Sequence, residues 1–266
     1  MDRENAMIPR TLVSACVISS LIGSSPGQGQ EAPGSPIPVS SGQLVLVLSE
    51  SFDANTGWLR RFERQTEDEA WAAVGTVTPI TLGRNGLGLG SGLHEIDPAD
   101  MPVKQEGDGK SPAGAFRLSS AFGYAAVEQL DNLEIPYTHV TELLECVDDV
   151  KSGYYNQVVL RDAVDEVDWE SSEQMLMDGI WYEKGIVVDH NSDPVIPGAG
   201  SCIFLHNWSG PEDTTAGCTA MAPPALTEMV YWLDSDADPV LVQLTESLYE
   251  EFQTVWGLPG PFSIDN

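Results

Sequence analysis

Short runs of β-favouring residues fill the chain from residue 43 onward. The runs at 43–49 (QLVLVLS), 58–64 (WLRRFER) and 77–83 (VTPITLG) are separated by Gly, Asn, Asp and Pro. In the second run Trp58, Arg60 and Phe62 fall on one face of an extended chain, because successive side chains of a strand point to opposite faces. The pattern predicts short strands joined by hairpins.

Two further strands are predicted in the C-terminal half of the chain. IVVDH (186–190) is typical of a buried strand, and SCIFLHNW (201–208) follows it after a turn. In the second of these strands Cys202, Phe204 and His206 share one face. His206 therefore ends a stiff element, which holds a side chain in place better than a loop does.

Helical patterns are fewer. In APPALTEMVYWLDSD (222–236) a double proline precedes apolar residues at helical spacing, which predicts a helix that starts near Pro224. The irregular segment 124–197 predicts two short helices, over 138–149 and 171–179. The glycine-dense segment 83–92 predicts a turn-rich loop, since no helical pattern follows it as in a dinucleotide-binding unit. The expected fold is mainly β with a few helices, a sandwich or barrel-like sheet.

The first residues differ in composition from the rest. Arg3 and Arg10 precede a thirteen-residue apolar run at 11–23, and small, polar and turn-forming residues follow. This pattern predicts a signal peptide (1–29), a flexible linker (30–42) and a single domain (43–266), exported to the periplasm or the extracellular space. No run reaches the length of a membrane span. VSAC at 13–16 leaves lipid anchoring at Cys16 open as an alternative.

The chain is strongly acidic, with 41 Asp and Glu against 12 Lys and Arg and a formal net charge of -29. Such a charge repels phosphate backbones and anionic lipid surfaces, so nucleic acid is not an expected partner. The acidic residues are spread along the chain, which is typical of a well-hydrated surface. We expect the protein to be a monomer.

The segment HNWSGPEDTTAGCTAM (206–221) places a histidine and a cysteine around a polar loop. Cys218 is either a nucleophile with His206 as its base, a buried thiol, half of a disulfide or a metal ligand. For a nucleophile, the N–H groups of Gly217 and Cys218 would form an oxyanion hole, and a helix that starts nearby would favour the thiolate. Trp208 would line the cleft.

Two segments carry a resemblance to a known family. IFLHNW followed by TTAGCTAM resembles the signature of the YkuD-type L,D-transpeptidase domain, and GDGKSPAGAF resembles its upstream GxxTPxGxF turn. The resemblance covers roughly residues 43–245. It implies a Cys218 nucleophile, a His206 base oriented by the carbonyl of Asn207, and an oxyanion and substrate pocket that Thr215, Gly217 and Thr219 shape. The implied partners are peptidoglycan stem peptides, cross-linked or trimmed through a thioester without a cofactor or metal.

The sequence also departs from the family pattern. Asn207 stands where the family often has Gly, and Ala220 stands where it has Arg or Asn. The second change removes a donor for a substrate carboxylate. Three alternatives remain open: a catalytically silent cell-wall-binding module, a carboxypeptidase only, and a zinc site built from Asp189, His190, His206 and a cysteine. None of the usual zinc spacings is present.

The remaining cysteines predict a disulfide. Cys16 would leave with the signal peptide and Cys218 would stay free for chemistry, so Cys146 and Cys202 are the pair left over. Structural cysteines of exported proteins tend to bridge in an oxidising environment. The alternative is two separate buried thiols.

Overall fold

The structure is a computed structural model that describes residues 34–262. The predicted signal peptide, Cys16 and the first part of the predicted linker lie outside the described residues. The strands are β1 (Gln43–Ser49), β2 (Thr56–Glu63), β3 (Ala72–Thr81), β4 (Leu87–Leu89), β5 (Ser111–Gly123), β6 (Tyr137–His139), β7 (Leu144–Val147), β8 (Val158–Leu160), β9 (Ser172–Gln174), β10 (Lys184–Val188), β11 (Phe204–Asn207), β12 (Thr219–Met221) and β13 (Val240–Thr245). The helices are η1 (Val127–Gln129), α1 (Pro223–Trp232), η2 (Ser235–Ala237) and α2 (Glu246–Phe252).

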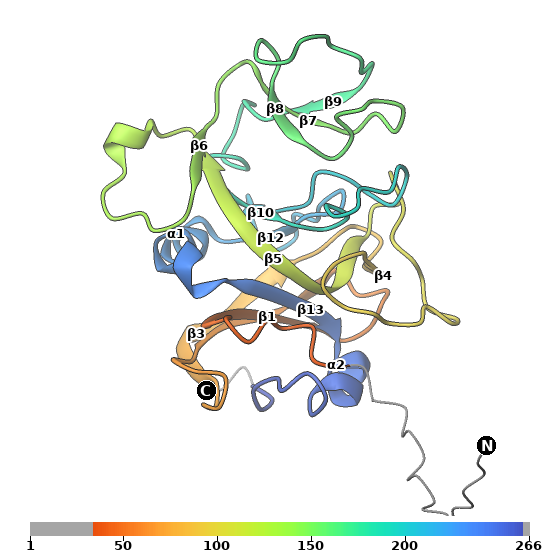
Figure 1. The fold of residues 1–266 in the computed structure, drawn as a ribbon, viewed down its shortest axis with the longest axis vertical. Coiled ribbons are helices and arrows are strands. Elements are labelled where there is room, and N and C mark those ends of the chain that lie inside the picture. The colour runs from red at the N-terminus through yellow and green to blue at the C-terminus, as the bar shows by residue number, and fades with distance from the viewer. Residues whose placement is uncertain (1–33, 263–266) are drawn as a thin grey trace, which may run out of the picture. The chain divides into compact units, whose positions relative to one another are not determined.

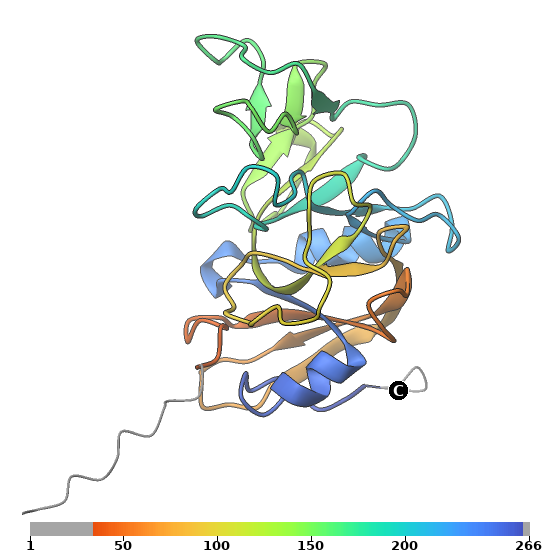
Figure 2. The ribbon, with the colours of Figure 1, turned by 90° about the vertical axis from the view of Figure 1, so that its right-hand side faces the viewer.

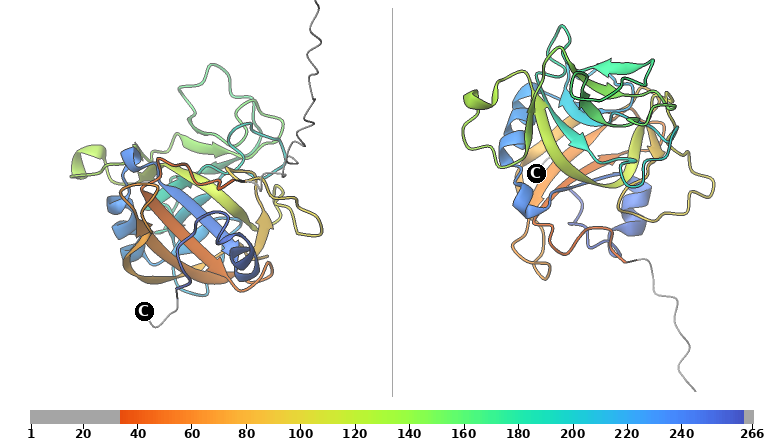
Figure 3. Two further views of the ribbon diagram at one scale, coloured as in Figure 1. Left: turned by 60° about the horizontal axis from the view of Figure 1, so that its bottom comes forward. Right: turned by 45° about the horizontal axis from the view of Figure 1, so that its top comes forward.

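The large sheet closes on itself. Neighbouring strands pair in the order β10, β11, β12, β3, β2, β1, β13, β5 and β4, and β10 also pairs with β5 (Figure 1). The long strand β5 bends as it crosses the structure (Figure 3), and it therefore pairs with both β13 and β10. Closure leaves few exposed sheet edges. The prediction of a mainly β, barrel-like fold is confirmed.

The strand β1 lies at the centre of this sheet and is buried at every position. It pairs antiparallel with β2 and parallel with β13. Val45 and Val47 pack into one apolar cluster, while Leu44, Leu46 and Leu48 pack into a second cluster on the other face. Because both faces are covered, the five residues LVLVL (44–48) are all apolar and do not alternate with polar residues.

The two α-helices cover different parts of the barrel (Figure 2). α1 packs against β10 and β11, and α2 packs against β13 and β1. Leu226, Met229 and Val230 of α1 are buried in the first cluster, as the helical spacing predicted. The helix begins at Pro223, where a missing N–H costs nothing because the first turn has no partner for it.

A separate three-stranded sheet replaces the two short helices predicted for the middle segment. It has the order β8, β7, β9 and lies at the top of Figure 1, at the opposite end from α2. The prediction of helices over 138–149 and 171–179 is therefore wrong. Leu144 and Cys146 face an apolar cluster while Glu145 points the other way, so a two-residue period fits β7 once its partner strands are present.

Glu145 anchors this small sheet from the face opposite the apolar cluster. Its carboxylate accepts hydrogen bonds from Arg161 (2.9 Å), Trp169 (2.9 Å) and Ser172 (2.6 Å). Burial by itself raises the pKa of Glu145, but the hydrogen bonds from Ser172, Arg161 and Trp169 outweigh it and lower the pKa to about 2. The charged carboxylate therefore stabilises the folded sheet.

This network predicts a loss of stability in acid. The folded-state pKa of about 2 lies below the unfolded value of 4.5, so the stabilisation is fully present above pH 4.5 and is lost as the pH falls toward 2. The difference between the two pKa values corresponds to a stabilisation of about 3 kcal/mol. We expect Glu145→Gln to lower the free energy of unfolding at pH 7 by about 3 kcal/mol. The substitution should also flatten the pH dependence of that free energy between pH 4.5 and 2, as measured by urea denaturation. The exposed Glu142→Gln is the control, and an unchanged pH dependence in Glu145→Gln would contradict the assignment.

A disulfide joins the small sheet to the barrel. Cys146 of β7 bonds to Cys202, two residues before β11, with 5.9 Å between their Cα atoms. This is the pair that the sequence predicted. Among residues 34–262, Cys218 is the cysteine that stays free. The bridge fixes the acidic middle segment beside the strand that carries His206.

Part of the predicted linker belongs to the folded domain. Ile37 is buried in the second apolar cluster, and the Ser35 hydroxyl donates a hydrogen bond to the carbonyl of Trp256 (2.8 Å). Residues 34–42 therefore pack on the domain instead of forming a flexible linker, because the C-terminal segment after α2 offers an apolar surface that the sequence pattern does not reveal. Within the described part of the chain, no helix is both long and apolar enough to cross a membrane.

Candidate active site

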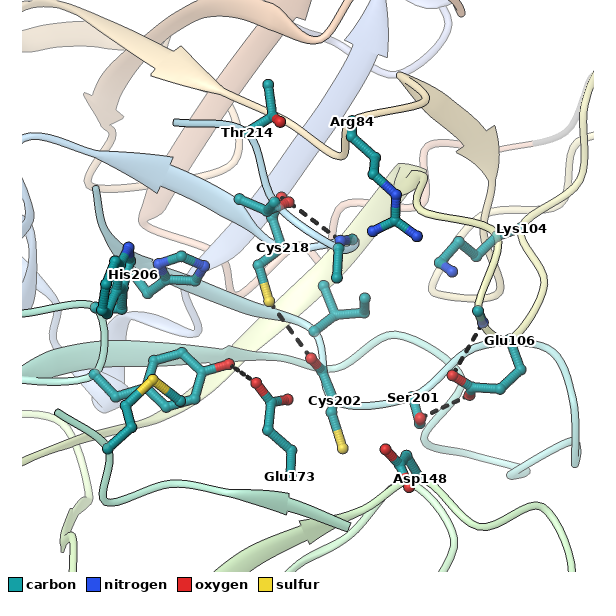
Figure 4. A pocket seen from close by; sticks show the side chains of 18 residues that line it. Arg84, Lys104, Glu106, Asp148, Glu173, Ser201, Cys202, His206, Thr214 and Cys218 are labelled. Atoms are coloured by element: carbon teal, nitrogen blue, oxygen red, sulfur yellow. Dashed lines mark hydrogen bonds between the residues drawn. The ribbon is translucent and has the colours of Figure 1, made fainter. Parts of the chain in front are cut away.

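A cavity of about 510 Å³ lies between the barrel and the three-stranded sheet (Figure 4). His206, Thr215, Gly217 and Cys218, all singled out from the sequence, line it. Residues from distant parts of the chain line it too, among them Glu173 of β9 and Trp181. The predicted histidine and cysteine are thus brought to one pocket that contains the free thiol.

The backbone of Cys218 is fixed by the upstream motif GDGKSPAGAF. The buried Ser111 hydroxyl donates to the carbonyl of Cys218 (2.7 Å) and accepts the N–H of Gly83 (2.8 Å). The Thr215 hydroxyl donates to the same carbonyl (2.6 Å). Ser111 also begins β5, so the two motifs that are distant in sequence meet at the nucleophile loop.

Removal of this hydroxyl should weaken both the fold and the site. Ser111→Ala leaves the buried N–H of Gly83 and one lone pair of the Cys218 carbonyl without a partner, which costs about 2 kcal/mol of stability. We expect turnover to fall about tenfold because the nucleophile is less well positioned. Ser111→Thr keeps the hydroxyl and is the control. Equal activity of the alanine and threonine variants in a steady-state assay would refute the role.

The glycine of the same motif makes room for the buried ring of His94. Gly114 has φ +141°, and a Cβ at this position would lie 1.9 Å from Cε1 of His94. His94 in turn accepts the N–H of Ala115 (3.0 Å) through Nδ1. A side chain at 114 would displace this buried ring, so the motif requires glycine here.

His206 lies on β11 with its imidazole directed toward Cys218 (Figure 4). Its Nδ1 lies 2.7 Å from the carbonyl of Asn207. Because a carbonyl only accepts, Nδ1 carries the proton and Nε2 is the basic nitrogen. The ring packs edge-on against Tyr182, with 5.4 Å between centroids. Burial lowers the pKa of His206 below its ordinary 6.5, so the imidazole is neutral at pH 7.

The thiol of Cys218 is buried and protonated in this structure. Sγ donates to the carbonyl of Cys202 (3.5 Å) and accepts the N–H of Phe204 (3.3 Å). Burial, and next the charge of Glu173, raise the pKa of Cys218 to about 12. The expectation that a helix start favours the thiolate is wrong, because β12 separates Cys218 from the start of α1 at Pro223. Cysteine and histidine therefore form a neutral pair.

Only some of the other predicted site residues lie at the cavity. The N–H of Gly217 donates to the Thr215 hydroxyl (3.1 Å), so it is already occupied. Thr219 does not line the cavity, because its hydroxyl donates to Gln243 inside the barrel (2.8 Å). Trp208 is buried and does not line the cavity either, and Trp181 takes that place. The predictions for Thr219 and Trp208 are wrong because both side chains serve the core.

Other lining residues were missed from the sequence. Tyr182 donates its hydroxyl to the carboxylate of Glu173, and both lie beside Cys218. Trp181 donates to Asp213 (2.9 Å), and Arg84 enters the cavity from the turn after β3. None of these residues stands in a motif, and the fold alone brings the middle segment over the cysteine. The pattern IWYEKG offered only a cluster of aromatic residues as a signal.

The zinc alternative is not supported by the positions of its residues. His190 uses both ring nitrogens on the backbone, since Nδ1 accepts from Ser91 (3.3 Å) and Nε2 lies 3.0 Å from the carbonyl of Ala199. Asp189 accepts from the Ser119 hydroxyl (2.6 Å). Between residues 34 and 262 no group of three or more His, Cys, Asp or Glu is arranged to hold a metal ion.

Comparison with known proteins agrees with this geometry. The family model of the YkuD L,D-transpeptidase catalytic domain matches residues 69–242, which is more than half of the 266-residue chain. No curated protein and no solved structure matches the chain significantly. The matched range contains His206 and Cys218, which line the cavity, and Ser111, which donates a hydrogen bond to the Cys218 carbonyl. The chain therefore belongs to the YkuD family of L,D-transpeptidase catalytic domains.

Proposed function

We propose that the protein is an exported cysteine L,D-transpeptidase that acts on peptidoglycan stem peptides through a thioester on Cys218. One observation carries the proposal. The Asn207 carbonyl fixes the proton of His206 on Nδ1 at 2.7 Å, which leaves Nε2 as a base in the cavity that holds the free thiol. A buried histidine with this orientation is the arrangement that general-base activation of a thiol requires.

The first half-reaction forms the thioester. The Cys218 side chain leaves the Cys202 carbonyl and turns toward His206, whose Nε2 accepts the thiol proton as sulfur attacks the carbonyl carbon of an L-residue joined to a D-residue. The tetrahedral intermediate collapses, the carbon–nitrogen bond breaks, and His206 returns the proton to the leaving amine. The neutral pair suits this step, because charge separates only as sulfur attacks.

Backbone N–H groups would stabilise the tetrahedral intermediate. The N–H of Gly217 is bonded to Thr215, so the N–H of Cys218 is the oxyanion donor that we propose. The hydroxyls of Ser111 and Thr215 hold the carbonyl of Cys218, in the peptide unit that follows, and thereby fix the backbone of Cys218. Thr215 therefore shapes the oxyanion pocket through the backbone and does not itself contact the oxyanion.

The second half-reaction releases the acyl group. An amine of a second stem attacks the thioester carbonyl, loses a proton to His206 and forms a cross-link, while sulfur leaves and recovers the proton. Water in place of the amine gives a trimmed stem by the same steps. Export is supported by the disulfide, which forms in oxidising compartments, and by the composition of residues 1–29.

Incubation of the protein with purified disaccharide-tetrapeptide tests the proposal. Mass spectrometry should show loss of the terminal D-residue and either a dimer, which identifies the amine acceptor, or a tripeptide monomer, which identifies water. Cys218→Ala is the matched control and should give neither. Unchanged substrate with the native protein would instead support a silent wall-binding module.

Loss of the base should be nearly as damaging as loss of the nucleophile. We expect His206→Gln to lower kcat/KM about a hundredfold or more, since His206 is the one histidine among the described residues that lines the cavity of Cys218. Because the pKa of His206 is lowered, the native enzyme should keep full activity below pH 6.5 and lose it only at more acidic pH. A pH–rate profile measures this. An acid limb centred above pH 6.5, or an active glutamine variant, would contradict the assignment.

A further inference from the structure

Arg84 has no partner of its own in a chain that is rich in acids. The sequence holds 41 acidic and 12 basic residues. Five other basic side chains form ion pairs, namely Arg61, Lys104, Arg117, Arg161 and Lys184. Within residues 34–262 the guanidinium of Arg84 makes neither an ion pair nor a hydrogen bond, and it lines the cavity of Cys218. An arginine kept apart from so many carboxylates is available for an anionic ligand.

The backbone around Arg84 is built into the nucleophile loop. The N–H of Arg84 donates to the carbonyl of Thr215 (2.9 Å), and Gly83 pairs with Thr215 as a parallel bridge. The guanidinium packs over Gly109, where a Cβ would lie 3.0 Å from its Cζ and Nε atoms. The direction of the side chain into the cavity is therefore fixed by the same turn that precedes Ser111 (Figure 4).

Lys104, the other cation of the cavity, is already neutralised. Its ammonium lies 2.6 Å from the carboxylate of Asp108 and donates to the carbonyl of Gln105 (2.6 Å). The opposite side of the cavity carries Asp148 and Glu173 (Figure 4). Glu106, which lies beside Lys104, accepts hydrogen bonds from the hydroxyls of Tyr155 and Ser201. A carboxylate on a ligand is therefore repelled by Asp148 and Glu173 and attracted to Arg84.

Ala220, which stands where the family resemblance implies Arg or Asn, does not line the cavity. Ala220 is 1 % exposed and lies in register with His206 and Thr81 inside the sheet. A cation for a substrate carboxylate must therefore come from another element. Arg84 is the cavity residue that meets this requirement, because a guanidinium binds a carboxylate through two parallel hydrogen bonds.

We propose that Arg84 binds the free carboxylate of the leaving D-residue and thereby selects stems that end in that residue. This inference rests on the proposed function. In a tetrapeptide stem the D-residue is terminal, so its carboxylate lies about one residue length, roughly 3.5 Å, from the carbonyl that Cys218 attacks. The cation must then line the same cavity as the thiol, as Arg84 does.

Binding of two peptides separates this role from a general effect of charge. Calorimetric titration of the full chain carrying Cys218→Ala should show about tenfold tighter binding of the tetrapeptide with a free terminus than of its terminal amide. Adding Arg84→Gln should remove that difference, and Arg84→Lys should retain part of it. Lys151→Gln, an exposed change of equal charge outside the cavity, is the control and should leave the difference intact.

The outcomes are distinguishable from those of the turnover assay. An unchanged preference of Arg84→Gln for the peptide with a free terminus overturns the inference. The inference also fails if binding weakens on amidation of an internal side-chain carboxylate and not on amidation of the terminus. Failure of both peptides to bind also overturns it. Absence of turnover in the native protein contradicts the proposed function, whereas the acid-to-amide ratio in the Cys218→Ala background still decides the role of Arg84.

Discussion

Cys218→Ser should abolish formation of the acyl-enzyme and lower turnover by about a thousandfold or more. The serine hydroxyl is similar in volume to the thiol and can still donate to the carbonyl of Cys202, so the fold should be retained. As a nucleophile it is far weaker, and a neutral imidazole whose pKa is already lowered removes its proton poorly. Intact-protein mass spectrometry after incubation with tetrapeptide should show the acyl adduct on the native chain alone.

Two control measurements accompany this prediction. The melting temperature of Cys218→Ser should match that of the native protein, which excludes unfolding as the cause. Cys218→Ala should be as inactive as the serine variant. An acyl adduct that survives in either variant would place the nucleophile elsewhere and remove the basis of the proposed function.

Removal of the Cys146–Cys202 disulfide should cause the largest loss of stability. The two residues are 56 positions apart, and closing so long a loop lowers the entropy of the unfolded chain by an amount that corresponds to about 4 kcal/mol. We expect Cys146→Ser combined with Cys202→Ser to lose about that much free energy of unfolding in urea. Turnover should fall too, because the Cys202 carbonyl and the strand that follows it border the thiol.

Thiol counting gives an independent check of the bridge. The denatured, unreduced mature protein should contain one free thiol, that of Cys218. Three free thiols would contradict the disulfide. A double alanine variant separates the entropy of the cross-link from the burial of two polar hydroxyls, and a loss below about 1 kcal/mol in that variant would show that the bridge adds little to stability.

Much of the barrel was predictable because its strands carry local signals. β1, β2, β10 and β11 are short runs of β-favouring residues between turn-forming residues, and α1 has its apolar positions at helical spacing. The strand end at His206 and the motif around Cys218 were predictable for the same reason, since each lies within one element or one turn. The cysteine pair followed from elimination among four residues.

The sequence by itself determined the β-rich fold, the His206 and Cys218 pair and the cysteines that bridge. Only the tertiary structure decided the three-stranded sheet, the entry of Arg84, Tyr182 and Glu173 into the cavity, and the protonated state of the thiol. The reason is physical. A strand such as β7 forms through hydrogen bonds to partners far along the chain, and a pKa depends on burial and on charges that the fold brings near. Neither quantity is present in a local run of residues.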